Sequence, residues 1–318
     1  MSRNRKWTVI LIATAVVGLL AVTTYLWTGR SKPKILVVLP TADNPFWIDM
    51  KLGVERGAAS VGGGFDVVIR TGPEDANAKA QIDILRDFRR TETIGALLLG
   101  PASSSEVVPE VAEYSRLGIP VVIVDSKLDP VAVKQHGAKV DAFLGSNNEQ
   151  GGEIAAKAIV ARFGNREISV LLIEGSAGHE TAIARSAGFQ KAAPKEWKIT
   201  RMDGNWDRAR AREVTEAALA VGIPNAIFAS SDEMAMGVIT ALDRASIPPA
   251  TLPVLIGFDA TADGLEAVSR GKMAATVKQR PLQIGEQALK IAAALARGEP
   301  GQASHQLLEV ELVSGNNP

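Results

Sequence analysis

The stretch KILVVLPTADNPFWIDMKLGVERGA, residues 34–58, joins an apolar run to a segment of helical spacing through a short polar connection. The run at 34–39 is continuously apolar after Lys34, as in a strand that is buried on both faces of a parallel sheet. Asn44, Phe46 and Trp47 stand at the start of the helical segment. A core accepts the two aromatic rings but has no obvious use for the amide, whereas a ligand site uses both. The stretch therefore predicts a strand, a binding loop and a helix.

The same alternation of apolar runs and helical segments continues to the end of the chain. We expect strands within 34–39, 65–70, 94–100, 119–125, 142–146, 168–175, 225–232 and 253–259. We expect helices within 46–62, 77–90, 104–117, 148–163, 181–193, 206–221, 233–245 and 281–297. This order predicts a doubly wound α/β fold, and the number of units favours two Rossmann-like lobes of roughly 110–130 residues each. The first crossover between the lobes is expected near 145–148.

Composition excludes several classes of function. The 318 residues carry no net charge and are 46% hydrophobic, which is unlike a nucleic-acid-binding surface. The absence of cysteine rules out disulfides, thiolate metal sites, a cysteine nucleophile and a lipoprotein anchor. His136, His179 and His305 are scattered without metal-binding spacing, and no nucleophile elbow or phosphate loop occurs. We therefore expect no enzyme, no metal and no cofactor.

Residues 1–30 differ from the rest of the chain. Basic residues at positions 3, 5 and 6 precede 21 uncharged residues at 7–27, and Arg30 follows. A helix of that length would span roughly 31 Å, enough for a bilayer core, and the basic side would stay in the cytoplasm. The segment 1–33 is thus expected to be a signal anchor or a cleaved signal peptide with a linker. Both export the globular part to the periplasm or the outer face of the membrane. A purely cytoplasmic protein is the remaining alternative.

Polar side chains follow most of the predicted strands. In open α/β sheets, ligands bind beyond the carboxyl ends of the strands. Carboxylates and amides there can pair with hydroxyl groups, and aromatic rings can cover the C–H face of a sugar. This combination favours a neutral polyol as the ligand. The residues found at these positions are Asn44, Phe46, Trp47, Asp125, Ser146, Trp206, Ser231, Asp259 and Gln279.

Each of these residues also has a structural interpretation. An aspartate after a strand is often a helix N-cap, which applies to Asp125, Asp232 and Asp259. Asn44 before a proline could open a turn and start a helix, and Phe46 could belong to the core. His179 and Glu180 are interpreted as solvated loop residues rather than ligand contacts, while Trp197 is interpreted as packing. The sequence leaves these alternatives open.

The ordered motifs resemble the periplasmic sugar-binding proteins of the ribose-binding type, the type I periplasmic binding proteins. The resemblance covers nearly all of 34–313. The blocks that carry it are NPFW, IPVVIVDS, GSNNEQGGEIAA, GSAG…ARSAGFQKA, FASSDEMAMG, IGFDATADGLEAV and GKMAATVKQRPLQIGEQA. LacI-type repressors share the fold, but they carry a helix-turn-helix where this chain has an apolar span. The resemblance implies two lobes joined by three hinge crossovers, with 34–146 and 280–307 in the first lobe and 147–279 and 308–318 in the second.

The resemblance also implies roles for individual residues. Asn44, Phe46 and Trp47 match ligand contacts of the first lobe, and Asp125 matches a carboxylate that binds sugar hydroxyls. In the second lobe, Trp206 matches a stacking aromatic and Asp259 a second carboxylate. Ser146 and Gln279 fall near two crossovers.

Three positions depart from the ribose-binding pattern. Ser126 stands where ribose binders have Arg after the strand-end Asp, Ile183 where they have another Arg, and Ser231 where they often have Asn, although Arg185 lies two residues beyond Ile183. Ser and Ile do not replace the planar donors of Arg. A ribose site would be under-paired, so we expect another sugar, a sugar alcohol or a bulkier, less polar ligand.

Two functions follow from the resemblance. The first is a monomeric, exported receptor that presents a small sugar or polyol to the permease of an ABC transporter. The second is a membrane-anchored sensor that uses the same binding event to signal to a partner such as a histidine kinase, held to the membrane through 7–27 if the segment is uncleaved. An enzyme on the same fold would need a nucleophile, a metal set or a phosphate loop, none of which the sequence shows.

Overall fold

The computed structural model describes residues 32–299 and 305–315, and those from Lys34 onward belong to one compact unit. The predicted anchor or signal segment at 7–27 lies outside the described residues. Of the helices in these two ranges, none combines the length and the apolar character needed to cross a bilayer.

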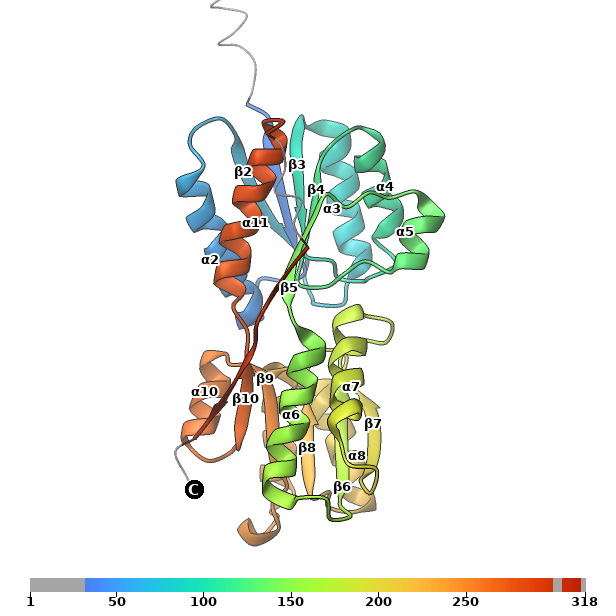
Figure 1. Ribbon diagram of the computed structural model, residues 1–318, viewed down its shortest axis with the longest axis vertical. Coiled ribbons are helices and arrows are strands. Elements are labelled where there is room, and N and C mark those ends of the chain that lie inside the picture. Colours follow the sequence, from blue (N-terminus) through green and yellow to red (C-terminus); the bar gives the residue numbers. More distant parts are fainter. Residues whose placement is uncertain (1–31, 300–304, 316–318) are drawn as a thin grey trace, which may run out of the picture. The chain divides into compact units, whose positions relative to one another are not determined.

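The first of two sheets is entirely parallel and has the strand order β11-β5-β4-β3-β1-β2 (Figure 1). The sequence order reverses between β1 and β3, which is the switch point where ligands bind in such sheets. The strands of this sheet are β1 (Lys34–Leu39), β2 (Asp66–Thr71), β3 (Ile94–Leu99), β4 (Val121–Val124), β5 (Ala142–Ser146) and β11 (His305–Leu308).

The second sheet repeats this topology in the order β12-β10-β9-β8-β6-β7. Its strands are parallel except β12, which pairs antiparallel with β10. The strands are β6 (Ser169–Glu174), β7 (Lys198–Asp203), β8 (Ala226–Ala229), β9 (Val254–Asp259), β10 (Ala275–Lys278) and β12 (Glu311–Ser314). The fold prediction of two doubly wound α/β lobes is therefore confirmed.

Helices cover both faces of each sheet. The first sheet is covered by α2 (Pro45–Ser60), α3 (Ala78–Thr91), α4 (Val108–Arg116), α5 (Pro130–His136) and α11 (Pro281–Ala296). The second carries α6 (Asn148–Phe163), α7 (Glu180–Ala192), α8 (Arg208–Val221), α9 (Asp232–Arg244), the short 3₁₀ helix η1 (Pro249–Thr251) and α10 (Ala262–Ser269). The sequence prediction missed the short helices α5 and α10 and the strands β7, β10, β11 and β12.

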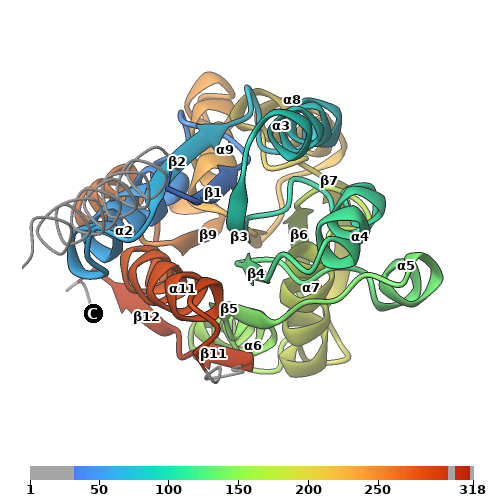
Figure 2. The same cartoon turned by 90° about the horizontal axis from the view of Figure 1, so that it is seen from above.

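The residues of β1 show why the first sheet is buried on both sides. Ile35, Val37 and Leu39 pack under α2 and α11, while Leu36 and Val38 face the helices α3 and α4. Successive side chains of a strand point to opposite faces, so a continuous apolar run serves both layers. Figure 2 shows α2 and α11 side by side on one face and α3 and α4 on the other.

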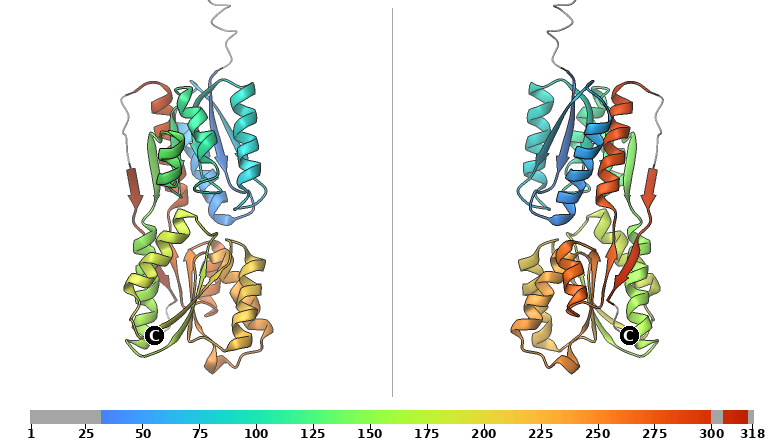
Figure 3. Two further views of the ribbon diagram at one scale, coloured as in Figure 1. Left: turned by 90° about the vertical axis from the view of Figure 1, so that its right-hand side faces the viewer. Right: turned by 90° about the vertical axis from the view of Figure 1, so that its left-hand side faces the viewer.

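The chain passes between the two sheets three times. These crossovers lie between β5 and α6, between β10 and α11, and between β11 and β12 (Figure 3). Leu308 pairs with Ser146 in the first sheet, so the predicted boundary at 308 is one residue too early. The other lobe boundaries stay predictions.

Candidate functional site

A cavity lies where the carboxyl ends of the strands of both sheets meet, with about 410 Å³ of atom-free space, part of which is open to solvent. Eight of the predicted site residues line it, and three do not: Ser126, Ser146 and Ile183. The lining residues that were predicted are Asn44, Phe46, Trp47, Asp125, Trp206, Ser231, Asp259 and Gln279. The sequence analysis did not assign the other six, which are Pro40, Asp75, Pro101, His179, Thr181 and Arg185.

Asn44 combines the two roles that the sequence left open. Its Oδ1 accepts a hydrogen bond from the Phe46 backbone nitrogen at 3.0 Å, so the residue caps α2. Its Nδ2 donates to Oδ2 of Asp75 at 2.9 Å, and the residue also lines the cavity. The proline at the first helical position holds this turn at the mouth of the site.

Phe46 and Trp47 form an aromatic wall at the start of α2. Their rings meet edge to face with centroids 5.0 Å apart, and both side chains are buried. A Cβ on Gly100 would lie 2.9 Å from Cζ3 of Trp47, so the glycine after β3 leaves room for the indole. Phe46 also belongs to the core, as its alternative interpretation stated. The two rings thus offer apolar faces to a ligand from a fixed position.

Asp75, in the loop after β2, is a cavity residue that the sequence analysis missed. Its Oδ1 accepts from Nε1 of Trp47, and its Oδ2 accepts from Asn44. Burial raises the pKa of Asp75 to about 6, with Asp125 and Glu233 adding to the rise and the two hydrogen bonds opposing it. Its position after the strand expected within 65–70 was the signal that could have identified it.

Asp125 follows β4 and points into the cavity with one free carboxylate oxygen. Oδ2 accepts from Oγ of Ser126 at 3.0 Å, whereas Oδ1 has no hydrogen-bond partner in the described part of the chain. The backbone φ of Asp125 is 66°, in the left-handed region that Asp and Asn tolerate better than most residues. Only 6% of the residue is exposed. A hydroxyl or ammonium group of a ligand would satisfy the free oxygen.

Ser126 lies behind this carboxylate and links the two lobes. Its Oγ is within hydrogen-bonding distance of Oγ1 of Thr181 and lies 3.3 Å from Nδ1 of His179. Both partners stand at the start of α7 in the second lobe. The prediction of Ser126 as a ligand contact is not matched by the lining of the cavity, because its hydroxyl is directed at α7 instead.

His179 closes the same end of the cavity. Its Nε2 lies 3.3 Å from the carbonyl oxygen of Pro101, and its ring meets that of Trp206 edge to face at 5.7 Å. Burial lowers the pKa of His179, and the nearby carboxylate of Asp125 opposes this only in part. The interpretation of His179 as a solvated loop residue is wrong, since only 8% of it is exposed.

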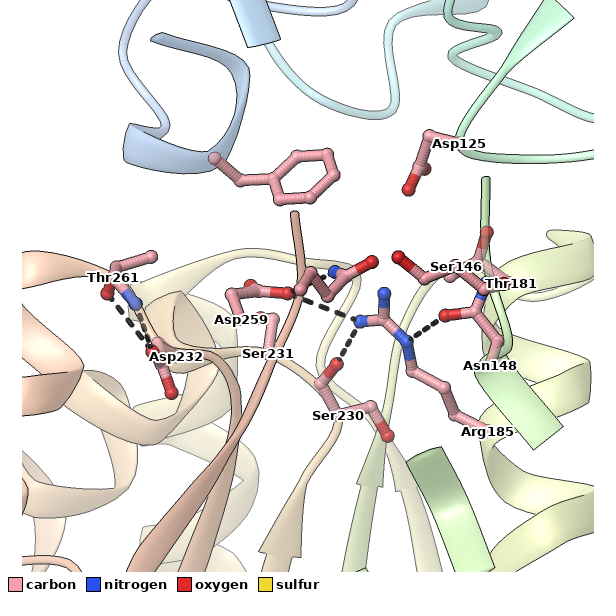
Figure 4. Close-up of polar contacts among 12 residues, drawn as sticks. Asp125, Ser146, Asn148, Thr181, Arg185, Ser230, Ser231, Asp232, Asp259 and Thr261 are labelled. Carbon is pink, nitrogen blue, oxygen red and sulfur yellow. Dashed lines mark hydrogen bonds and ion pairs between the residues drawn. The ribbon is translucent and has the colours of Figure 1, made fainter. Parts of the chain in front are cut away.

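Arg185 is the residue of α7 that lines the cavity where the sequence analysis expected Ile183. Its Nε donates to Oδ1 of Asn148 at 2.9 Å, and its Nη1 donates to the Ser230 carbonyl at 2.5 Å (Figure 4). The guanidinium also lies 3.7 Å from the centroid of the Phe258 ring. Ile183, by contrast, is 51% exposed. Residues two apart on a helix point in nearly opposite directions, so Arg185 on α7 faces the cavity and Ile183 does not.

Asp259 and Gln279 form the wall opposite Asp125. Gln279 donates from Nε2 to Oδ1 of Asp259 at 2.7 Å, and its own Oε1 has no partner among the described residues. Nη1 of Arg185 lies 3.7 Å from the same carboxylate oxygen. Burial raises the pKa of Asp259 well above its usual range, against the opposing charge of Arg185. The φ of Asp259 is 118°, a strained value of the kind found at binding sites.

Trp206 supplies an aromatic face from the second lobe. A Cβ on Gly175, directly after β6, would lie 2.0 Å from Cζ2 of the indole, so this glycine makes the position of the ring feasible. The φ of Trp206 is 60°, and its Nε1 has no hydrogen-bond partner in the ranges described. The ring and an unpaired donor are therefore both available to a ligand.

Two further predicted residues, Ser231 and Ser146, differ in position: the first lines the cavity and the second does not. Ser231 lines the cavity and caps α9, since its Oγ accepts from the Met234 nitrogen at 3.2 Å. Ser146 is buried at the end of β5 without lining the cavity, and its Oγ has no partner in the described structure. Asp232, which was interpreted as a cap, instead binds the backbone nitrogen and hydroxyl of Thr261 and the hydroxyl of Thr276. It fixes the loops around the site from outside the cavity.

The arrangement suits reversible binding of a hydroxylated molecule. Carboxylate, amide and guanidinium groups stand at the two polar walls, and three aromatic rings offer apolar faces. Within residues 32–299 and 305–315, no group of three or more acidic, histidine or cysteine side chains could hold a metal ion. The geometry is that of a small-molecule site buried between two domains.

Comparisons with known proteins agree with this geometry. A family model described as a periplasmic binding protein domain matches residues 35–300. The D-allose-binding periplasmic protein of Escherichia coli strain K12 is 34% identical over 260 residues, which are 80% of this chain and 82% of that protein. The ribose import binding protein of Haemophilus influenzae is 33% identical over 279 residues, which are 86% of this chain and 89% of that protein.

Solved structures give the same result. An ABC transporter periplasmic solute-binding protein from Actinobacillus succinogenes with bound D-allose superposes with a TM-score of 0.79 at 25% identity, covering 89% of this chain and 98% of that one. A solute-binding protein from Bacillus halodurans with bound myo-inositol gives a TM-score of 0.77 at 25% identity, covering 90% and 96%. The chain therefore belongs to the periplasmic binding protein family that its sequence motifs resemble.

Proposed function

We propose that the protein captures a small sugar or polyol between its two lobes and presents it to an ABC importer. The observation that carries this proposal is the cavity, in which polar groups from the strand ends of both sheets converge on one space lined by aromatic rings. Relatives and structural neighbours named above are described with D-allose, ribose or myo-inositol, which supports the same class of ligand.

The polar walls can pair with ligand hydroxyl groups both as hydrogen-bond acceptors and as donors. Oδ1 of Asp125 and Oε1 of Gln279 can accept hydrogen bonds from a ligand, and Nε1 of Trp206 can donate one. Each of these atoms is buried and has no partner among the described residues, so a ligand that pairs with it removes a desolvation cost. The rings of Phe46 and Trp47 cover the apolar face of the ligand.

Binding in this cavity requires the lobes to open and close. The side chains that line it come from both lobes, and contacts such as that between the Glu180 nitrogen and Oγ of Ser104, 3.0 Å long, join the lobes directly. Hinge movement at the three crossovers is the motion expected of such a receptor. The closed form would then be the one that a permease recognises. We place the protein in the periplasm as a monomer, with no catalytic step.

A thermal-shift screen of the purified protein tests the proposal. Pentoses, hexoses, polyols and amino acids are added at increasing concentration. A ligand at about 100 times its Kd adds roughly 2.7 kcal/mol to the free energy of unfolding, so the correct sugar or polyol should raise the Tm by several degrees. The compound should be recovered unchanged. A shift with amino acids alone, or turnover of the sugar, would contradict the proposal.

The sensor alternative remains a hypothesis. No observation on the described residues favours it, and the segment 7–27 that would anchor a sensor lies outside them. Neighbouring genes for a permease and an ATPase would support transport, and a neighbouring kinase gene would support sensing.

A further inference from the structure

The charges in the cavity are not balanced. Asp75 and Asp125 stand on the first-lobe side, and Asp259 stands on the second-lobe side with Arg185. Arg185 forms its ion pair with Asp259, whereas neither Asp75 nor Asp125 has a basic group within ion-pair distance in the described parts of the chain. Burial keeps His179 neutral by lowering its pKa, so it supplies no compensating charge at neutral pH. The first-lobe wall is therefore anionic.

An outer pocket, with about 910 Å³ of atom-free space that includes open solvent, continues this anionic surface. It shares Asn44, Asp75 and Trp206 with the cavity, so these three residues separate the two spaces. The outer pocket is lined by five carboxylates and one guanidinium. The carboxylates belong to Asp43, Glu74, Asp75, Asp207 and Glu233.

The single guanidinium of the outer pocket is already neutralised. Arg208 forms two hydrogen bonds with Glu233, at 2.8 Å and 3.1 Å, and one with Asp263 at 3.1 Å. The remaining carboxylates give the approach to the cavity a negative potential. Clefts lined by one sign of charge concentrate ligands of the opposite sign.

The free oxygen of Asp125 shows that this charge is available to a ligand. The residue is only 6% exposed, and its Oδ1 has no partner among the described residues. In Figure 4 the carboxylate points from the first lobe into the space above Arg185. Each oxygen of Asp75 accepts one hydrogen bond and can accept another. The two carboxylates can thus receive a donor that carries several N–H bonds.

We propose that the preferred ligand of this cavity is a sugar or polyol that carries a protonated amine, bound with its ammonium group at the first-lobe wall beside Asp75 and Asp125. The inference rests on the proposed function and narrows its class of ligand. A neutral sugar would desolvate both carboxylates and bring no charge of its own. This is costly because the Arg185 guanidinium, whose pKa burial lowers against the opposing charge of Asp125, is already paired with Asp259. The ammonium supplies that charge, and the rings of Trp47 and Phe46 favour a nearby cation.

Matched pairs of ligands test this inference by isothermal titration calorimetry at about pH 7, where an amine with a pKa near 8 is mostly protonated. The pairs differ only in an amine or a hydroxyl group: D-allosamine and D-allose, D-glucosamine and D-glucose, D-galactosamine and D-galactose, and glucamine and sorbitol. In at least one pair the amine should bind at least about tenfold more tightly than its parent. N-acetylation, which removes the charge, should abolish that advantage.

Two further measurements assign the effect to the named residues. Asp75→Asn should bring the ratio of amine to parent affinity closer to one, because the substitution removes one of the two charges. The hydrogen bond that an asparagine cannot accept from Asn44 or Trp47 is lost for both ligands, so it cancels in the ratio. Asp87→Asn, on the exposed side of α3, should leave the ratio as in the wild type. Raising the salt concentration should weaken the amine more than the parent, because the outer pocket is exposed to screening.

The outcomes separate the inference from the proposed function. If the parent sugars bind and every amine binds equally or more weakly, the inference is wrong and the proposed function stands. A preference for the amine that is unchanged in Asp75→Asn would also overturn the assignment. If no sugar, polyol or amine binds, both proposals fail.

Discussion

Arg185 and Asp259 face each other across 3.7 Å, with only 3% and 5% of their side chains exposed. The guanidinium is also held by Asn148, by the Ser230 carbonyl and by the face of Phe258. Burial lowers the pKa of Arg185 and raises that of Asp259, so each charge depends on the other and on its hydrogen bonds. Because the two residues come from α7 and the end of β9, the pair fixes the shape of the second-lobe wall.

Replacing Arg185 with Lys should weaken ligand binding by about tenfold to a hundredfold. An ammonium cannot make both hydrogen bonds and stack on Phe258 at the same time, so one acceptor or the carboxylate of Asp259 loses its partner. Calorimetry with the ligand from the thermal-shift screen measures the effect. Arg201→Lys is the matched control, because Arg201 makes a bidentate pair with Glu174 on the surface and away from the cavity. Equal losses in the two variants would contradict the role of Arg185.

Two substitutions of Asp125, by Asn and by Ala, should distinguish the loss of a ligand contact from the cost of backbone strain. Asn tolerates the φ of 66° and keeps the side-chain shape, so it should lower affinity by about tenfold or more with little change in Tm. Ala should abolish binding and cost a further ~1 kcal/mol of stability, because an alanine disfavours the left-handed region. Binding and thermal unfolding are measured for both variants. Wild-type affinity in Asp125→Asn would show that the free carboxylate oxygen does not contact the ligand.

Strands and site residues could be predicted from the sequence where the signal lies in neighbouring residues of the chain. A strand buried on both faces is a continuous apolar run, and the residue that follows it must lie at the carboxyl edge of the sheet. Asp125 and Asp259 could be placed on that basis. The strands β11 and β12 are only four residues each, with several exposed side chains, so they lack an apolar run. Their pairing partners are distant in sequence and were not predictable from a local pattern.

The residues that were missed depend on tertiary contacts. Asp75 follows a half-buried strand, and its role arises from contacts with Asn44 and Trp47, about thirty residues away. His179 contacts Ser126 and Pro101 of the other lobe, which the sequence of one lobe does not show. The choice between Ile183 and Arg185 depends on the rotation of α7, and an error of two residues selects the opposite face.

Gly175→Ala should displace Trp206 and reduce affinity by about tenfold or more. The new Cβ would lie 2.0 Å from the indole, far inside contact distance, and the ring would have to leave its place on the cavity wall. Tryptophan fluorescence should change in the same variant. Gly222→Ala is the control, since a Cβ there meets nothing within 4 Å and its φ of 167° is extended. Unchanged binding and fluorescence in Gly175→Ala would show that the ring does not need this position.

Asp232→Asn should change how stability depends on pH. Burial raises the pKa of Asp232 to about 6, although the hydroxyls of Thr276 and Thr261 donate to its carboxylate. Its pKa in the unfolded chain is about 3.9, so between about pH 4 and pH 6 the folded state binds more protons than the unfolded state. The contribution of Asp232 to the free energy of unfolding therefore falls as the pH rises through this window.

The difference in unfolding free energy between Asp232→Asn and the wild type isolates this contribution from all other groups. Near pH 4 the aspartate is almost fully protonated in the folded state and about half protonated in the unfolded state, so the difference should still be small. Between pH 4 and pH 7 the difference in unfolding free energy should shift in favour of the variant by about 2 kcal/mol. The reason is that ionisation of the buried carboxyl group destabilises only the wild type. Urea unfolding at several pH values measures this difference. Asp83→Asn is a control for which the opposite pH dependence is expected. The hydrogen bond and charge of Lys79 lower the pKa of the exposed Asp83. As the pH rises, the unfolding free energy of this variant should therefore fall relative to that of the wild type. A flat or falling difference for Asp232→Asn would mean that the hydrogen bonds from Thr261 and Thr276 outweigh burial.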